Sequence, residues 1–109
     1  MKVCEFSELC GFSPITTPDP EREIGGCYMG DLLSWVMGRA LENDAWITIM
    51  SNQNVIAVAS LAAVSCVILA ENVVPEEDIV LLAKEKNVNL ISSPLPAYET
   101  AKKLFTVLK

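Results

Sequence analysis

Few residues in this 109-residue chain could perform catalysis, because the sequence contains no histidine. A nucleophile needs a base beside it, and without histidine only lysine or a carboxylate could serve. Ser51, Ser92 and Ser93 have no marked partner in the sequence, and they are typical of turn and cap positions. A pair of carboxylates, Asp31 with Glu71, could carry out acid–base chemistry, although no spacing requires it. We therefore predict that the chain is not an enzyme.

The four cysteines, at positions 4, 10, 27 and 66, do not have the spacing of a metal site. No two of them are separated by two residues, as they are in zinc sites and thioredoxin-like motifs. We predict no metal, no cofactor, and thiols that are reduced and mostly buried. Cys27 is the best candidate for a reactive thiol, because it precedes an expected helix N-terminus, which favours the thiolate. The alternative is that Cys27 is an ordinary small strand residue.

The net charge of −6 and the short apolar runs exclude several classes of partner. A protein that binds nucleic acid through phosphates needs clustered basic residues, and Lys102-Lys103 is the only adjacent pair here. No uninterrupted apolar run approaches the roughly 18 residues of a membrane span. Met1-Lys2 is not followed by the apolar segment of a signal peptide. We expect a cytoplasmic protein without a nucleic-acid or membrane partner.

The apolar pattern predicts one α/β domain over residues 1–109. Hydrophobic residues make up 51% of the sequence, which is enough for a core. Short apolar strands alternate with amphipathic helices, as in a three-layer α/β/α sandwich with a largely parallel sheet. The predicted helices cover 2–10, 31–41, 54–64, 75–86 and 97–108. The predicted strands cover 12–16, 23–28, 46–50, 66–70 and 88–91, and Pro14 places the first of them at an edge.

Capping residues mark where the helices should begin. Asp31 is a candidate N-cap or first-turn acid for the second helix, and Asn52 or Asn54 can cap the third. Pro75 suits the first position of the fourth helix. The acids at 76–78 favour the positive end of its dipole, and we interpret them as a solvated first turn. The apolar stripe that should face the core in the second helix consists of Leu32, Leu33, Val36, Met37, Ala40 and Leu41.

Polar residues after the predicted strands suggest a place for a ligand. In open α/β sheets, ligands bind outside the carboxyl ends of the strands. The loops expected there are rich in hydrogen-bonding groups and poor in catalytic ones, which favours a binding module over an enzyme. The glycines match neither the dinucleotide-binding motif nor the P-loop, and tight packing is the alternative explanation for them. The candidate ligand-binding residues are Gly25, Gly26, Gly30, Asp31, Ser51, Asn52, Gln53 and Asn54.

Nearly the whole chain resembles the DRTGG domain family. The segments that carry the resemblance are 22–26, 30–38, 44–52, 54–60, 70–77 and 92–100. The motif that names the family is imperfect, because Glu21 replaces its first acid and Glu23-Ile24 separates Arg22 from Gly25 and Gly26. The resemblance implies a three-layer α/β/α fold similar to the N-terminal domain of HPr kinase/phosphorylase. It also implies a part in dimerisation and regulation. Stand-alone members that it resembles are often labelled HPr kinases, but we expect no kinase activity here because the chain has no P-loop.

The residues and the resemblance together lead to two hypotheses for function. The first is a non-catalytic regulatory or ligand-sensing module that dimerises and binds a small ligand such as a nucleotide. The second is a redox- or metal-linked accessory protein of anaerobic electron-transfer systems. It rests on the four cysteines and on a resemblance to stand-alone family members of anaerobes.

Two helices predict a homodimer. The third predicted helix is apolar on nearly every face, and a small sheet can cover only one side of it. On the second predicted helix, Trp35 and Gly38 lie opposite the apolar stripe. The ring offers contact area and the glycine permits close approach, as a two-fold interface requires. The alternative is that Trp35 packs under the N-terminal segment, against Phe6 or Phe12.

Overall fold

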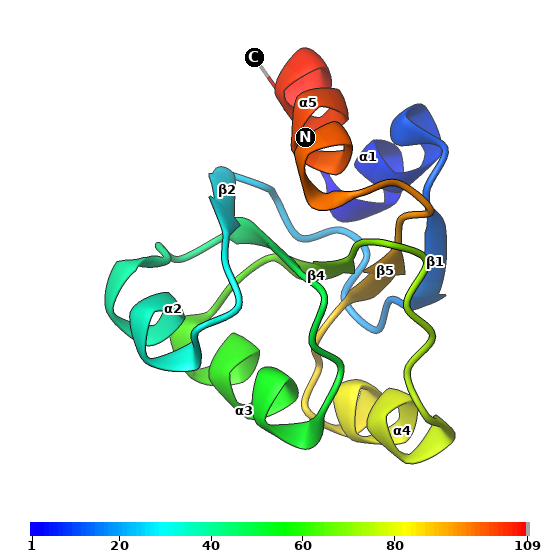
Figure 1. The fold of residues 1–109 in the computed structure, drawn as a ribbon. Coiled ribbons are helices and arrows are strands. Elements are labelled where there is room, and N and C mark those ends of the chain that lie inside the picture. Colours follow the sequence, from blue (N-terminus) through cyan, green and yellow to red (C-terminus); the bar gives the residue numbers. More distant parts are fainter. Residues whose placement is uncertain (109) are drawn as a thin grey trace.

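The computed structural model describes residues 1–108 as a five-stranded sheet between two layers of helices (Figure 1). The strands are β1 (Ser13–Thr16), β2 (Gly26–Met29), β3 (Asp44–Thr48), β4 (Cys66–Leu69) and β5 (Leu90–Ser92). The helices are α1 (Val3–Cys10), α2 (Leu33–Arg39), α3 (Gln53–Ala62), α4 (Glu77–Glu85) and α5 (Ala97–Leu108). The predicted three-layer α/β/α architecture is confirmed.

The strand order is β1-β5-β4-β3-β2, and only β1 runs antiparallel to its neighbour. Each parallel strand lies beside the one before it in the chain, so the three crossovers advance in the same direction. Because such crossovers are right-handed, α2, α3 and α4 lie on one face of the sheet. The terminal helices α1 and α5 cover the other face (Figure 1). Pro14 lies in the edge strand β1, as predicted.

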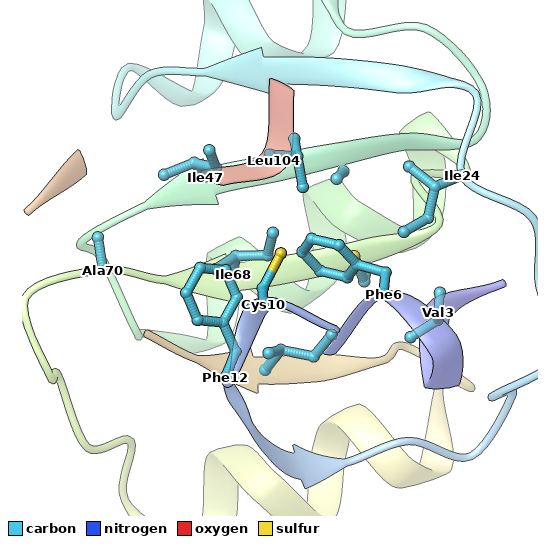
Figure 2. Packing of buried hydrophobic residues seen from close by; sticks show 12 residues of the cluster. Val3, Phe6, Cys10, Phe12, Ile24, Ile47, Ile68, Ala70 and Leu104 are labelled. Atoms are coloured by element: carbon cyan, nitrogen blue, oxygen red, sulfur yellow. The ribbon is translucent and has the colours of Figure 1, made fainter. Parts of the chain in front are cut away.

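Strand side chains alternate between two apolar clusters, one on each face of the sheet. Trp46 and Val67 belong to the cluster under α2, α3 and α4. Ile47 and Ile68 belong to the cluster under α1 and α5, where Leu104 reaches them (Figure 2). Every residue of β3 and β4 is buried. Burial on both faces explains why these strands are almost continuous apolar runs in the sequence.

The second helix differs most from its prediction. The prediction placed it over 31–41, whereas α2 has seven residues and Asp31 does not cap it. The Asp31 carboxylate instead accepts hydrogen bonds from the Thr48 hydroxyl, at 2.6 Å, and from the N–H of Ile49, at 3.1 Å. Asp31 therefore joins the loop after β2 to the end of β3.

The prediction that an apolar stripe on this helix faces the core is also mostly wrong. Of its six residues only Val36 is buried. The reason is that α2 stands at the end of its helical layer and has one helix, α3, beside it. Leu33 and Ala40 are half-buried against the same cluster. The exposed members of the stripe are Leu32, Met37 and Leu41.

The other helix ends are closer to the predictions. Asn52 caps α3, because its side chain accepts hydrogen bonds from the N–H groups of Asn54 and Val55. Pro75 lies outside α4, whose N-cap is Glu76. β3 begins two residues earlier than predicted.

The helix α3 is covered within the chain on more than its sheet-facing side. It contacts α2 on one flank and α4 on the other (Figure 1). Val55, Ile56, Val58 and Ala59 are buried, and Leu61 is the exposed large apolar side chain. The premise that α3 needs a partner chain to cover it is therefore wrong.

Candidate functional site

A polar cleft of about 550 Å³ opens between the loop after β3 and the start of α4. Both segments follow the carboxyl ends of neighbouring parallel strands, so they meet at one edge of the sheet. The cleft is lined by Met50, Ser51, Asn52, Gln53, Glu76, Asp78 and Ile79. Three predicted ligand-binding residues, Ser51, Asn52 and Gln53, are thus brought together. Asn54 follows them in the first turn of α3 and is not among the lining residues.

Two helices begin at this cleft, and their ends differ. The positive end of each helix dipole lies at its N-terminus. At α3 the Asn52 side chain satisfies two backbone N–H groups. At α4 the Glu76 side chain makes no cap hydrogen bond. The carboxylates of Glu76 and Asp78 add negative charge to the lining, which opposes the binding of a free phosphate there.

The lining supplies hydrogen-bonding groups of both kinds. Carboxylates accept hydrogen bonds, whereas the amides of Asn52 and Gln53 both donate and accept them. Met50 and Ile79 add apolar surface. Within residues 1–108, no three His, Cys, Asp or Glu side chains are grouped as metal ligands would be. The cleft is therefore suited to a neutral or positively charged group that donates hydrogen bonds.

The serines considered as nucleophiles lie in different settings. Ser51 lines the cleft, while the hydroxyl of Ser93 lies 2.8 Å from that of Thr100 in the interior. Ser93 also accepts a hydrogen bond from the N–H of Leu95. Ser93 therefore stabilises the turn before α5, as its sequence context suggested.

Gly30 and Asp31 lie at the carboxyl edge but outside the cleft lining. The Gly30 carbonyl accepts a hydrogen bond from the indole Nε1–H of Trp46 at 2.9 Å. The N–H of Gly30 donates to the Ile47 carbonyl. Together with the Asp31–Thr48 hydrogen bond, these contacts fix the loop between β2 and α2. In the structure these two residues position this loop.

Gly25 and Gly26 lie at the opposite edge of the sheet from the cleft. Gly26 is the first residue of β2 and pairs with Asp44, the first residue of β3. The expectation that these glycines lie at the carboxyl edge with Ser51 was wrong, because β2 begins at Gly26, which places both glycines at the amino end of the strand. A Cβ atom on Gly26 would lie 2.8 Å from Asp44 Oδ1, so tight packing explains this glycine.

Arg22, which sequence analysis left without a role, connects three segments at that edge. Its Nε–H donates to Asn43 Oδ1 at 3.0 Å, and its Nη2 donates to the Ala63 carbonyl at 2.7 Å. Ala63 is the left-handed C-cap of α3, with φ of 57°. The Gly25 N–H donates to the Asn43 carbonyl. The arginine and glycines of the motif therefore form a structural junction.

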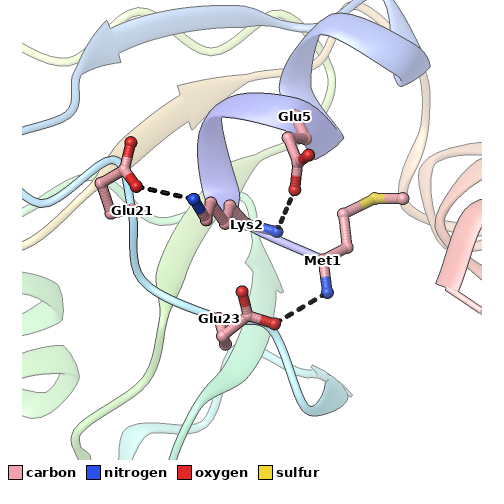
Figure 3. A network of polar contacts seen from close by, with 5 residues as sticks. All are labelled: Met1, Lys2, Glu5, Glu21 and Glu23. Atoms are coloured by element: carbon pink, nitrogen blue, oxygen red, sulfur yellow. Dashed lines mark hydrogen bonds and ion pairs between the residues drawn. The ribbon is translucent and has the colours of Figure 1, made fainter.

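The acids that flank Arg22 contact the N-terminal segment (Figure 3). Glu23 pairs with the Met1 amino group at 3.0 Å, and Glu21 pairs with Lys2 Nζ at 2.8 Å. The hydrogen bond with Glu21 raises the pKa of Lys2. Exposed pairs of this kind contribute little to stability. They orient the start of α1 against the segment before β2.

Cys27 lies within β2, and its environment opposes a reactive thiolate. It lines an apolar groove beside α5. Cys27 and Cys4 are exposed, and only Cys10 and Cys66 are buried, so the expectation of mostly buried thiols was wrong for two of the four. Partial desolvation of the Cys27 thiol in the groove, followed by the nearby Asp44 carboxylate, still raises the pKa of Cys27 to about 11. Burial raises the pKa of Cys66 to about 12. Ala45 separates the two cysteines in the sheet, so their Cα atoms are roughly 10 Å apart, too far for a disulfide. The expected preference for the thiolate at Cys27 was therefore wrong.

Trp35 is exposed on α2, with 52% of its surface accessible. The guanidinium of Arg39 lies 3.9 Å from the ring centroid, a cation–π contact. Phe6 and Phe12 pack against each other in the cluster on the other face of the sheet, so they do not cover Trp35. A Cβ atom on Gly38 would meet no other atom within 4 Å. Both residues are available for contact with a partner.

These features define a small α/β module with a polar cleft at the carboxyl edge of its sheet. The chain belongs to the DRTGG domain family, which matches residues 19–107. The resemblance identified from the sequence is therefore confirmed, and the imperfect motif occupies the structural junction around Arg22.

A solved structure shares the fold. It contains the CBS and DRTGG domains of the regulatory region of Clostridium perfringens pyrophosphatase, complexed with its activator, diadenosine tetraphosphate. The TM-score is 0.70 at 15% sequence identity, and the match covers 91% of this chain and 44% of that one. The chain thus spans less than half of that regulatory region, and the likeness shows the fold alone. Among curated proteins, none matches this chain. Within residues 1–108, no helix has the length and apolarity needed to span a bilayer.

Proposed function

We propose that this chain is a non-catalytic regulatory module that binds the nucleoside part of a nucleotide in the polar cleft. The observation that carries the proposal is the lining of the cleft, where carboxylates, amides and apolar side chains converge from two strand-end loops. The activator of the related pyrophosphatase region, a dinucleoside tetraphosphate, contains two such groups. Family membership supports a regulatory role.

The chemistry of the cleft favours the nucleoside over the phosphates. A carboxylate such as Glu76 or Asp78 can accept hydrogen bonds from ribose hydroxyls, as acidic residues do in dinucleotide-binding folds. The amide of Gln53 can pair with the polar edge of a base, while Ile79 packs against its face. Phosphates would be repelled by the same carboxylates, so they would extend toward solvent.

The second part of the proposal is a homodimer in which α2 contributes to the contact. Trp35 is an exposed aromatic residue, the type that most often dominates binding energy at interfaces. Gly38 leaves open space on the same helix. A two-fold contact would bury both, and a regulatory module that dimerises could transmit ligand binding to an attached or neighbouring subunit.

Calorimetric titration tests the ligand half of the proposal. Adenosine, AMP, ATP and diadenosine tetraphosphate are titrated into the chain without divalent cations. We expect adenosine to bind at least as tightly as ATP, because the phosphates add no favourable contact and are repelled by the carboxylates. Asp78→Asn should weaken adenosine binding, whereas Glu85→Gln, at the far end of the same helix, should not. Affinity that rises with each phosphate and ignores Asp78→Asn would contradict the proposal.

A further inference from the structure

The strand β2 leaves one edge of the sheet open and undefended. The other edge strand, β1, carries Pro14 and an irregular register between Pro14 and Thr16, and such features prevent further pairing. β2 has the sequence Gly-Cys-Tyr-Met, with neither proline nor charge. Met29 has 49% of its surface exposed. An unprotected edge of this kind invites another strand.

The hydrogen bonds of β2 determine which groups face outward. The N–H of Gly30 donates to Ile47 in β3. In a parallel ladder, alternate residues direct both backbone groups to the same neighbour, so Tyr28 also faces β3. The N–H and C=O groups of Cys27 and Met29 therefore face away from the sheet. The edge presents two donors and two acceptors.

An apolar groove of about 350 Å³ runs beside this edge, between β2 and α5. Its lining residues are Gly25, Gly26, Cys27, Ala101, Leu104, Phe105 and Leu108. Phe105 is 68% exposed. Tyr28 packs with the cluster under α2, so its neighbours Cys27 and Met29 face the side of α5. The groove and Met29 therefore lie on the same side of the sheet.

We propose that a second copy of this chain pairs with β2 in an antiparallel manner, with a two-fold axis at Tyr28. This register places Cys27 opposite Met29 of the second copy, and it forms four backbone hydrogen bonds. Opposed residues share a sheet face, so Met29 of the second copy enters the groove beside Cys27. The patch is self-complementary, since each copy supplies one methionine and one groove. The inference rests on the homodimer of the proposed function.

The size of the molecule indicates how much surface, in addition to the paired strands, a stable dimer interface must bury. Its extents are 30 × 27 × 25 Å, so one side offers roughly 700 Å², close to the 800 Å² per partner of a standard interface. Strand pairing alone covers only part of this area. The helices that flank β2 must also take part, α2 on one face and α5 on the other. An interface centred on β2 is thus compatible with a contact through Trp35.

Sedimentation of the full chain at micromolar concentration tests the inference. Met29→Asp would place a charge in the apolar groove, and it should raise the dissociation constant of the dimer at least about 100-fold. Leu81→Asp is the matched control, because Leu81 is 57% exposed on α4, which lies away from β2. The dissociation constant of the dimer should be unchanged in this variant. Circular dichroism checks that both variants fold.

Amide hydrogen exchange of the unmodified chain tests the same pairing without substitution. The N–H groups of Cys27 and Met29 should be protected in the dimer and should lose protection on dilution. A dimer that survives Met29→Asp and leaves both amides unprotected would overturn the edge pairing while leaving the proposed homodimer in place. A monomeric native chain would overturn both, and neither result bears on ligand binding.

Discussion

Substituting Gly25 and Gly26 one at a time by alanine tests whether tight packing requires the glycine at position 26 but not at position 25. In Gly26→Ala the new Cβ would lie 2.8 Å from Asp44 Oδ1, closer than carbon and oxygen can approach. Asp44 is 7% exposed, and its Oδ2 accepts a hydrogen bond from the Leu41 N–H at 2.8 Å. The carboxylate cannot move away without weakening that bond at the start of β3. We estimate a loss of about 1–3 kcal/mol in the free energy of unfolding.

Gly25→Ala is the control. Its Cβ would lie 3.8 Å from the nearest atom, the Cβ of Asn43, which is ordinary contact. Alanine also restricts the unfolded chain, so this variant should be unchanged or more stable by about 0.4–1 kcal/mol. Urea unfolding of both variants measures the difference. Thermal unfolding should show Gly26→Ala about 10 °C below the native chain. Equal stabilities of the two variants would refute the packing argument.

Two further predictions concern stability. Arg22→Met removes two hydrogen bonds from a charged, half-buried group and should cost about 2 kcal/mol by urea unfolding; an unchanged midpoint would contradict the role of Arg22 in the junction. The raised pKa of the Cys27 and Cys66 thiols, to about 11 and about 12, means that the folded chain keeps protons that unfolded thiols lose near their ordinary value of 9.0. The resulting stability is complete below pH 9 and is lost as the pH rises toward 12. The variant Cys66→Ala should lose less stability over this range, and an identical loss would contradict the assignment.

Much of the fold could be predicted because the burial of the central strands is visible in the sequence. Strands β3 and β4 are buried on both faces, which produces uninterrupted apolar runs. Asn52 could be identified as a cap because a polar turn precedes an apolar helix. These confirmed predictions depend either on residues adjacent in the sequence, as the Asn52 cap does, or on burial alone, as the central strands do.

The errors arise where tertiary contacts override local patterns. Asp44 lies two residues before the predicted start of the third strand, yet it begins the buried strand β3 because the Leu41 N–H satisfies its carboxylate. The apolar stripe of α2 was predicted to be buried, but the sequence does not reveal that only one helix, α3, lies beside α2 and covers it. Half of the cleft was found from Ser51 and its neighbours. The other wall, with Glu76 and Asp78, comes from a segment interpreted as a solvated helix start.

The most direct test of the proposed function is a titration of the labelled chain with adenosine, followed through backbone amide resonances. The proposal predicts that shifts are confined to the cleft, at residues 50–53 and 76–79, and that they saturate with a single dissociation constant. The amides of Gly25 and Gly26, at the other edge of the sheet, should not move. Saturating shifts centred on Gly25 and Gly26, with the cleft resonances unchanged, would contradict it.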